Sequence, residues 1–211
     1  MVFRASIVIN VLVALLSILA WLWILLGAGD SGQLAQRGIG SLKYFTVLSN
    51  IFSAAVSAIY LVVCVGGGVQ PPLWLVVLKL VAAAAVMLTF LTTAILLMPL
   101  YGWKGLYVGG NLWLHLILPL LAAADCCLFL PVSDVPLSLM PWAMVPVAAY
   151  GAFYLRQVLV HGAEENGVVY DFYGFLRWGR SKIPMVLAAM LLVTWGIALV
   201  LRALGGFVGL A

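Results

Sequence analysis

The sequence has very little charge. Of its 211 residues, 8 % are Asp, Glu, Lys or Arg and 66 % are hydrophobic, whereas a soluble domain has about 25 % charged residues. So little charge excludes a water-soluble fold and indicates a membrane protein. The net charge is only +4. We interpret it as a sign of unevenly distributed basic residues that contact anionic membrane lipids, and we expect no nucleic-acid partner.

Cysteine and glycosylation signals are also scarce. The three cysteines, Cys64, Cys126 and Cys127, lie at or inside apolar segments and match no metal-ligand spacing. An adjacent pair does not easily form an ordinary disulfide, so we expect all three to be small packing residues. No Asn-x-Ser/Thr site occurs. The sequence therefore gives no sign of a bound metal or another cofactor.

Long hydrophobic runs make up most of the chain. A membrane-spanning helix needs about 20 mainly apolar residues, and six windows meet this requirement: 5–27, 44–65, 73–98, 112–130, 142–160 and 184–204. The first follows Arg4 as a signal peptide would, but its apolar stretch is longer than a signal-peptide core. We expect an all-α, polytopic membrane protein with one six-helix transmembrane domain over residues 1–211.

Basic residues are unevenly divided between the two sides of the membrane. Most lie in or beside loops 1–2, 3–4 and 5–6: Arg37, Lys43, Lys104, Arg156, Arg177, Arg180 and Lys182. Arg4 and Arg202 lie near helix ends on the other side of the membrane from these loops. The positive-inside rule therefore predicts that loops 1–2, 3–4 and 5–6 are cytoplasmic and that both termini are outside.

Loop 5–6, residues 161–183, differs from the short Gly- and Pro-rich connectors elsewhere. Its charged residues are interleaved with aromatic ones: Tyr170, Phe172, Tyr173, Phe175 and Trp178. Such a mixture of basic and aromatic side chains is typical of the headgroup level of a membrane. We expect an amphipathic interfacial loop, which is either an anchor or a lid over a site that opens on the same face.

Two of the windows carry polar residues at matching depth. In the second window, five polar residues at three- and four-residue spacings share one helix face: Thr46, Ser49, Asn50, Ser53 and Ser57. In the fourth window, His115 lies about one turn inside the membrane, as Thr46 does, because both helices start from the same side. Small hydroxyl residues can also be packing contacts, and a His can be held by a neighbouring hydroxyl or carbonyl.

A hydroxyl and an imidazole at one depth can act as nucleophile and base, so we expect Thr46 and His115 to be catalytic. A low-dielectric site favours the neutral imidazole that a base requires. Asn111, one turn before His115, can orient the ring, and Asn50, one turn after Thr46, is the candidate donor to an oxyanion. Pro119 frees the carbonyl of His115 and loosens the helix at that point.

The remaining charged residues have structural or binding roles in this interpretation. Lys79 and Asp125 lie at matching depth and are expected to form an ion pair, with a proton or ion pathway as the alternative. Asp171 is the only carboxylate placed to join the catalytic pair as a third member. An ester with long acyl arms would lie among the helices with its carboxylate at Arg156 or Lys43.

The order and spacing of these residues resemble those of the androgen-induced protein family and its bacterial six-helix membrane relatives: Lys43, Tyr44, Phe45, Thr46 and Asn50, then Asn111, His115 and Pro119, then Pro146, Tyr150, Tyr154 and Arg156. Animal members are multi-pass intramembrane hydrolases that use a Thr and a His to cleave fatty-acid esters of hydroxy fatty acids. Residues 170–180 follow the family pattern only loosely.

The resemblance implies that Thr46 is the nucleophile and His115 its partner. It also implies a lipid-like ester substrate and a multi-pass location in a bacterial cytoplasmic membrane. The residues expected to contact the substrate are Lys43, Ser49, Tyr150, Tyr154 and Arg156.

Two other functions fit parts of the pattern. A non-enzymatic lipid or small-molecule carrier would line a passage with the polar stripe and relay protons through His115 and Asp125, but residues 5–98 and 112–204 show no inverted repeat. A haem-binding span would need an axial pair of ligands, and His161, the second His of the chain, lies at a helix end beside a loop.

Overall fold

The fold comes from a computed structural model, which describes residues 2–26 and 38–208. The α-helices are α1 (Val2–Leu25), α2 (Phe45–Tyr60), α3 (Leu73–Thr92), α4 (Met98–Tyr101), α5 (Trp103–Leu106), α6 (Gly110–Leu112), α7 (Leu118–Phe129), α8 (Val145–His161) and α9 (Ile183–Val208). Two short antiparallel strands, β1 (Glu164–Glu165) and β2 (Val168–Val169), form a hairpin. Shorter 3-10 segments are Gly38–Lys43, Val132–Asp134, Leu137–Met144, Phe175–Trp178 and Arg180–Lys182.

Within the described residues, six helical stretches are long and apolar enough to cross a membrane: Arg4–Leu25, Phe45–Gly66, Leu73–Leu97, Gly110–Phe129, Leu137–His161 and Arg180–Val208. The prediction of an all-α, multi-pass membrane protein is confirmed. The fifth stretch begins earlier than expected, because the 3-10 segment Leu137–Met144 leads directly into α8. Pro141 lies inside that segment, directly before the predicted window 142–160.

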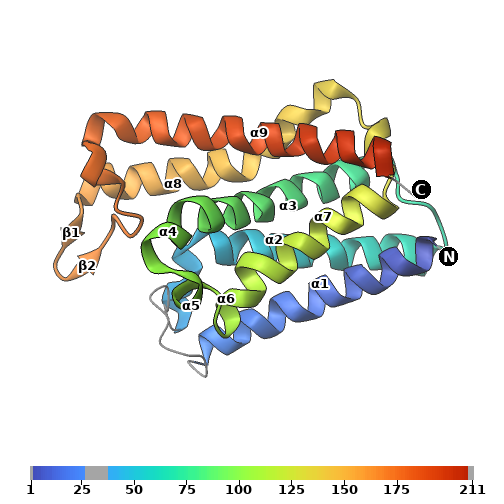
Figure 1. The fold of residues 1–211 in the computed structure, drawn as a ribbon, viewed down its shortest axis with the longest axis horizontal. Helices are drawn as coiled ribbons and strands as arrows, with labels where there is room; N and C mark the ends of the chain where they lie inside the picture. Colours follow the sequence, from blue (N-terminus) through green and yellow to red (C-terminus); the bar gives the residue numbers. More distant parts are fainter. Residues whose placement is uncertain (1, 27–37, 209–211) are drawn as a thin grey trace.

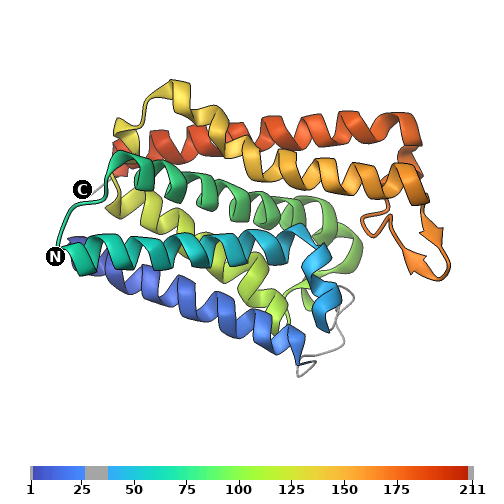
Figure 2. The same cartoon turned by 180° about the vertical axis from the view of Figure 1, so that it is seen from behind.

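The helices run side by side along the longest axis of the molecule (Figures 1 and 2). The central helix is α3, which packs against α2, α7 and α9 and is the most buried of the six spans. Its run Ala82–Ala85 is fully buried, and such small side chains let neighbouring helices approach closely. Both termini lie at one end of the bundle, whereas α4, α5, α6 and the hairpin lie at the other.

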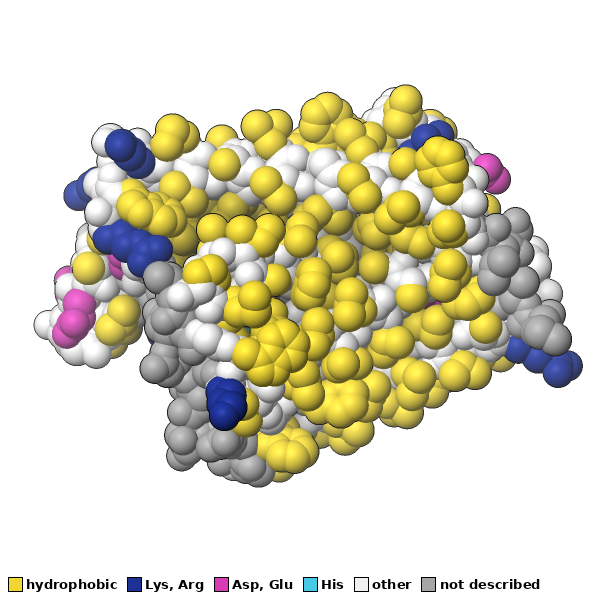
Figure 3. Space-filling view, viewed as in Figure 1, with side chains coloured by type: hydrophobic (Ala, Val, Ile, Leu, Met, Phe, Trp, Pro, Cys, Tyr) yellow, Lys and Arg dark blue, Asp and Glu magenta, His cyan; other side chains and the backbone are white. Residues whose placement is uncertain are grey.

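The surface of the molecule matches the membrane assignment. On the face that Figure 3 shows, hydrophobic side chains form a broad belt across the middle, with Lys and Arg side chains at the two ends and most of them at the hairpin end. The three cysteines are buried and unpaired, as expected of packing residues.

Among the described residues, three segments have π-helical geometry: Leu61–Gly66, Thr93–Leu97 and Trp113–Ile117. The second and third are each followed by a proline, Pro99 and Pro119, two residues after their last residue. Proline has no N–H and crowds the carbonyl four residues back, so the helix widens before it. The predicted loosening of the helix at His115 is confirmed, since the Leu118 N–H bonds the carbonyl of Trp113, five residues back.

The predicted ion pair is confirmed, with Lys79 Nζ 2.9 Å from Asp125 Oδ2 and the two side chains 3 % and 0 % exposed. Asn10 of α1 accepts from Lys79 at 2.7 Å and donates to Asp125 at 2.9 Å. Ser6 donates to the other carboxylate oxygen at 2.7 Å, and Ser57 accepts from Lys79 at 3.3 Å. The network joins α1, α2, α3 and α7, and it satisfies both charges, as a structural pair requires.

Candidate functional site

His115 lies in the interior of the bundle, within the π-helical segment Trp113–Ile117, and is 6 % exposed. Its Nδ1 lies 2.8 Å from Oγ1 of Thr93, the first residue of the π-helical segment that continues α3. Thr93 is 1 % exposed. The structure therefore joins His115 to a hydroxyl of the third span, which the sequence did not single out.

Thr46 lies half-buried in the first turn of α2. Its carbonyl accepts hydrogen bonds from Ser49 Oγ at 3.1 Å and from Asn50 Nδ2 at 2.8 Å. Asn50 also donates to the carbonyl of Leu114, the residue before His115, at 3.1 Å. The two helices thus meet at the expected depth. Among the described residues, no hydrogen bond joins the Thr46 hydroxyl to His115.

The amide of Asn50 is committed to the backbone. Both carbonyls that it contacts need a donor, so Nδ2 must face them and Oδ1 must point away. Its Oδ1 is buried and has no partner within residues 2–26 and 38–208. Both hydrogens of the Asn50 amide are therefore used by backbone carbonyls, which leaves no N–H of this side chain for an oxyanion.

The other two candidate partners of the catalytic pair have different surroundings. Asn111 is half-buried in α6, and its side chain has no hydrogen bond to any described residue. Asp171 accepts the hydroxyl of Tyr154 and the backbone N–H groups of Phe175 and Leu176, at 2.8 and 2.9 Å for the last two. Its carboxylate is used within loop 5–6 and the end of α8, so the structure gives it no link to His115.

Loop 5–6 reaches the start of α2 through Tyr173. The Phe45 N–H donates to Tyr173 Oη at 2.9 Å. The two phenols of Tyr173 and Tyr150 lie 3.3 Å apart, and Tyr150 donates to the carbonyl of Lys43 at 2.6 Å. Burial raises the pKa of Tyr173, and it raises the pKa of Tyr44 to about 12 with a smaller effect of Tyr173. Both phenols therefore stay protonated at neutral pH.

The two basic residues expected to hold a substrate carboxylate lie outside the bundle core. Lys43 Nζ is 5.0 Å from the ring centre of Phe172 and 5.5 Å from that of Tyr44, within the range of cation–π contacts. Arg156 is exposed on α8. Tyr154, two residues earlier on the opposite face of α8, is buried against loop 5–6. Only Lys43 is close to the start of α2.

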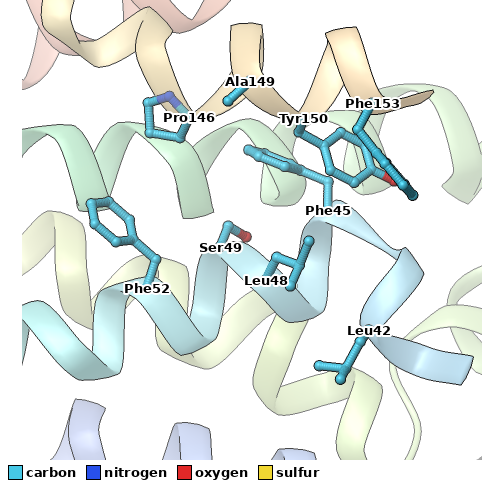
Figure 4. Close-up of a pocket in the computed structure, with 9 residues that line it drawn as sticks. All are labelled: Leu42, Phe45, Leu48, Ser49, Phe52, Pro146, Ala149, Tyr150 and Phe153. Carbon is cyan, nitrogen blue, oxygen red and sulfur yellow. The ribbon is translucent and has the colours of Figure 1, made fainter. Parts of the chain in front are cut away.

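A groove of about 470 Å³ runs between α2 and α8 (Figure 4). Its lining is almost entirely apolar: Leu42, Phe45, Leu48, Ser49, Phe52, Pro146, Ala149, Tyr150 and Phe153. Leu48 and Phe153 on its rim are exposed, so the groove opens on the hydrophobic belt of the molecule. Of the residues predicted to contact substrate, Ser49 and Tyr150 line this groove.

Most of the groove residues were missed in the sequence. On α2 they recur at positions 45, 48, 49 and 52, which is a helical face next to the polar stripe. Their apolar side chains look the same as lipid-facing ones, so the sequence held no signal that separated the two. In the part of the chain that the structure describes, no three His, Cys, Asp or Glu side chains come together as metal ligands would.

Comparison with known proteins gives no matching family model, no similar curated protein and no similar solved structure. What the site can do is therefore inferred from its own residues.

Proposed function

We propose that the protein is an intramembrane hydrolase of lipid esters, in which Thr46 is the nucleophile and His115 the general base. The observation that carries this proposal is the position of His115. Its buried imidazole lies 2.8 Å from the Thr93 hydroxyl. The carbonyl of the preceding residue, Leu114, accepts a hydrogen bond from Asn50 on the helix that carries Thr46. An ionisable side chain inside a span is costly and usually functional. The sequence resemblance adds the substrate class, fatty-acid esters of hydroxy fatty acids.

The chemistry takes two steps. The neutral imidazole takes the hydroxyl proton of Thr46 as Oγ1 attacks the ester carbonyl, and the proton then passes to the departing alkoxide. This step forms an acyl ester on Thr46 and releases the hydroxy fatty acid. In the second step His115 takes a proton from water as the water oxygen attacks the acyl carbon. It then returns that proton to Thr46 Oγ1 as the acyl–Oγ1 bond breaks and the free fatty acid leaves. Since water must reach the acyl ester, a site near the membrane surface suits this step better than one at the midplane.

The groove between α2 and α8 is the place for an acyl arm of the substrate. Its volume of about 470 Å³ is within the range of roughly 300–1,000 Å³ for small-molecule pockets. Phe45 and Ser49 line it and flank Thr46 in the first turns of α2. An acyl chain that entered from the lipid belt would therefore lie beside the helix that carries the nucleophile.

The test is ester turnover by the purified protein in detergent. Thr46→Ala and His115→Ala should each abolish turnover, and Thr46→Ser should retain part of it, because it keeps the nucleophilic oxygen. A serine-hydrolase-type fluorophosphonate probe should label Thr46 in the wild type and not in Thr46→Ala.

Thr92→Ala is the matched control. The Thr92 hydroxyl bonds only carbonyls of its own helix, at 2.8 and 3.0 Å, so this variant should keep wild-type turnover. Wild-type turnover in Thr46→Ala would contradict Thr46 as the nucleophile. Transfer of a labelled fatty acid across vesicles without any hydrolysis would support the carrier function instead.

A further inference from the structure

We propose that Thr93 positions His115, so that the site has three members: Thr46, His115 and Thr93. In this arrangement the Thr93 hydroxyl holds Nδ1 of the ring and leaves Nε2 for the proton of Thr46. The inference rests on the proposed function and adds a residue that acts through the base. Its structural basis is the 2.8 Å contact between Thr93 Oγ1 and His115 Nδ1.

Burial separates the roles of the two hydroxyls. Thr93 is 1 % exposed, and it is not among the residues that line the groove between α2 and α8. Thr46 does not line the groove itself, but it is half-buried, and Phe45 and Ser49, which precede and follow it on α2, do line the groove. A nucleophile must touch the reacting carbon. Thr46 meets this requirement better, and Thr93 is left with the ring of His115.

The tautomer of His115 follows from this division. With its hydrogen on Nδ1, the ring donates to Thr93 and carries the lone pair on Nε2, where a base for Thr46 needs it. With its hydrogen on Nε2, the ring would instead accept from Thr93 and could not take a proton at that nitrogen. The proposal therefore requires the Nδ1–H tautomer in the resting protein.

A neutral partner suits this depth in the membrane. In Ser-His-Asp sites a carboxylate holds the base in the correct tautomer. Here the carboxylate of Asp171 is engaged by Tyr154 and by backbone N–H groups of its own loop. A buried carboxylate beside His115 would need a positive partner in the lipid-embedded core, whereas a hydroxyl needs only a hydrogen bond.

The backbone brings Thr93 and His115 together through two matching irregularities. Each residue lies in a π-helical segment, Thr93–Leu97 or Trp113–Ile117, and each segment ends two residues before a proline. A π turn holds one residue more than an α turn, which changes side-chain direction by about 100°. Segments of this kind are frequent at functional sites. The two segments meet at the hydrogen bond between Thr93 and His115, which indicates that this contact is a specific feature of the fold.

The first experiment compares three substitutions by turnover. Thr93→Val keeps the shape and removes the hydroxyl, and we expect kcat to fall on the order of a hundredfold with KM little changed, the loss that an ångström of misplacement can cause. Thr93→Ser keeps a hydroxyl and should stay within a few-fold of wild type. Thr92→Val, the neighbouring control, should behave as wild type. Serine rescue also protects the test if the valine variant folds poorly.

The second experiment reads the tautomer directly. Nitrogen-15 NMR of the ring in a His161→Gln background reports His115 alone, because the chain has two histidines. We expect the Nδ1–H form in the otherwise wild-type protein and a mixture of tautomers in Thr93→Val. A purely structural role for Thr93 would leave the tautomer unchanged.

Each outcome decides between the inference and the proposed function. Wild-type turnover and an unchanged tautomer in Thr93→Val would overturn the inference and leave the hydrolase proposal intact. A covalent adduct mapped to Thr93, or the Nε2–H form in the wild type, would make Thr93 the activated hydroxyl and also overturn it. Absence of turnover in the wild type would end the hydrolase proposal, and the tautomer would still show whether Thr93 fixes the ring.

Discussion

At the scale of single residues, Tyr173 provides a hydrogen-bond acceptor that the start of α2 lacks. The first N–H groups of a helix have no partner inside the helix, and Tyr44 at the N-cap of α2 provides no side-chain hydrogen bond. Tyr173, 128 residues later, accepts the Phe45 N–H and links it to Tyr150. Loop 5–6 is therefore hydrogen-bonded to α2 at Phe45, the residue before Thr46. This bond is a specific contact through which an interfacial loop can be held at the start of α2.

Removal of the Tyr173 hydroxyl should loosen this attachment. Tyr173→Phe keeps the aromatic contacts but leaves the partly buried Phe45 N–H without this partner, which should lower the free energy of unfolding by about 1 kcal/mol. Denaturant titration in detergent measures the change. Tyr170→Phe is the control, because Tyr170 stacks on His161 with ring centres 4.2 Å apart and contacts no part of α2 in the described structure. Equal losses from the two variants would show that the bond to Phe45 contributes nothing specific.

Residue type decided how much of the site could be predicted. Lys79, Asp125 and His115 stand out in the sequence, because an ionisable group in a span is costly unless it has a partner. Thr93 and Asn10 do not, because hydroxyls and amides are ordinary contacts between membrane helices. Which of them meets a charged or ionisable group depends on the rotation of each helix about its axis, and packing of the whole bundle sets that rotation.

At the scale of helices, the buried network around Lys79 and Asp125 ties α1 to the rest of the bundle. The sequence predicted the pair from matched depth but missed Ser6 and Asn10, which supply three of its hydrogen bonds. The helix that carries them, α1, has most of its other side chains on the outer surface. Polar contacts at one end therefore add to the packing of α1 against α2 and α7.

This arrangement predicts strong coupling between the two charges. Lys79→Met or Asp125→Leu alone strands the opposite charge in a buried site and should cost about 3–5 kcal/mol of unfolding free energy. The double variant should lose clearly less than the sum of the two, although Ser6 and Asn10 then lack their charged partners. Unfolding in mixed detergent micelles gives the three values.

Lys104→Met is the control for loss of a positive charge, because Lys104 is exposed in α5. It should leave stability close to that of the wild type. Losses from the two single changes that simply add in the double variant would show that Lys79 and Asp125 are independent, and the ion pair would then have no energetic role.

At the scale of the whole molecule, the apolar belt and the charged ends follow from composition. The six spans could be predicted because about 20 apolar residues are needed to cross the bilayer wherever they occur. The groove between α2 and α8 could not, because it exists only where two helices with ordinary apolar faces diverge. Most Lys and Arg side chains on the face that Figure 3 shows lie at the hairpin end, and from this asymmetry the positive-inside rule predicts that this end faces the cytoplasm.

Single cysteines in a variant without the native cysteines test both the fold and its orientation. The three native cysteines are buried, so their replacement by Ala removes every native thiol and leaves the surface unchanged. Lys104→Cys and Asn166→Cys lie at the hairpin end and should react with a membrane-impermeant maleimide only in inside-out vesicles. Gly67→Cys and Asp134→Cys, in the loops at the end that holds both termini (Figure 1), should react only in intact cells.

Reversal of all four would keep the six-helix fold and reverse its orientation. Reaction of Lys104→Cys and Asn166→Cys from opposite sides would rule out the six-helix crossing, and with it the shared depth of Thr46 and His115.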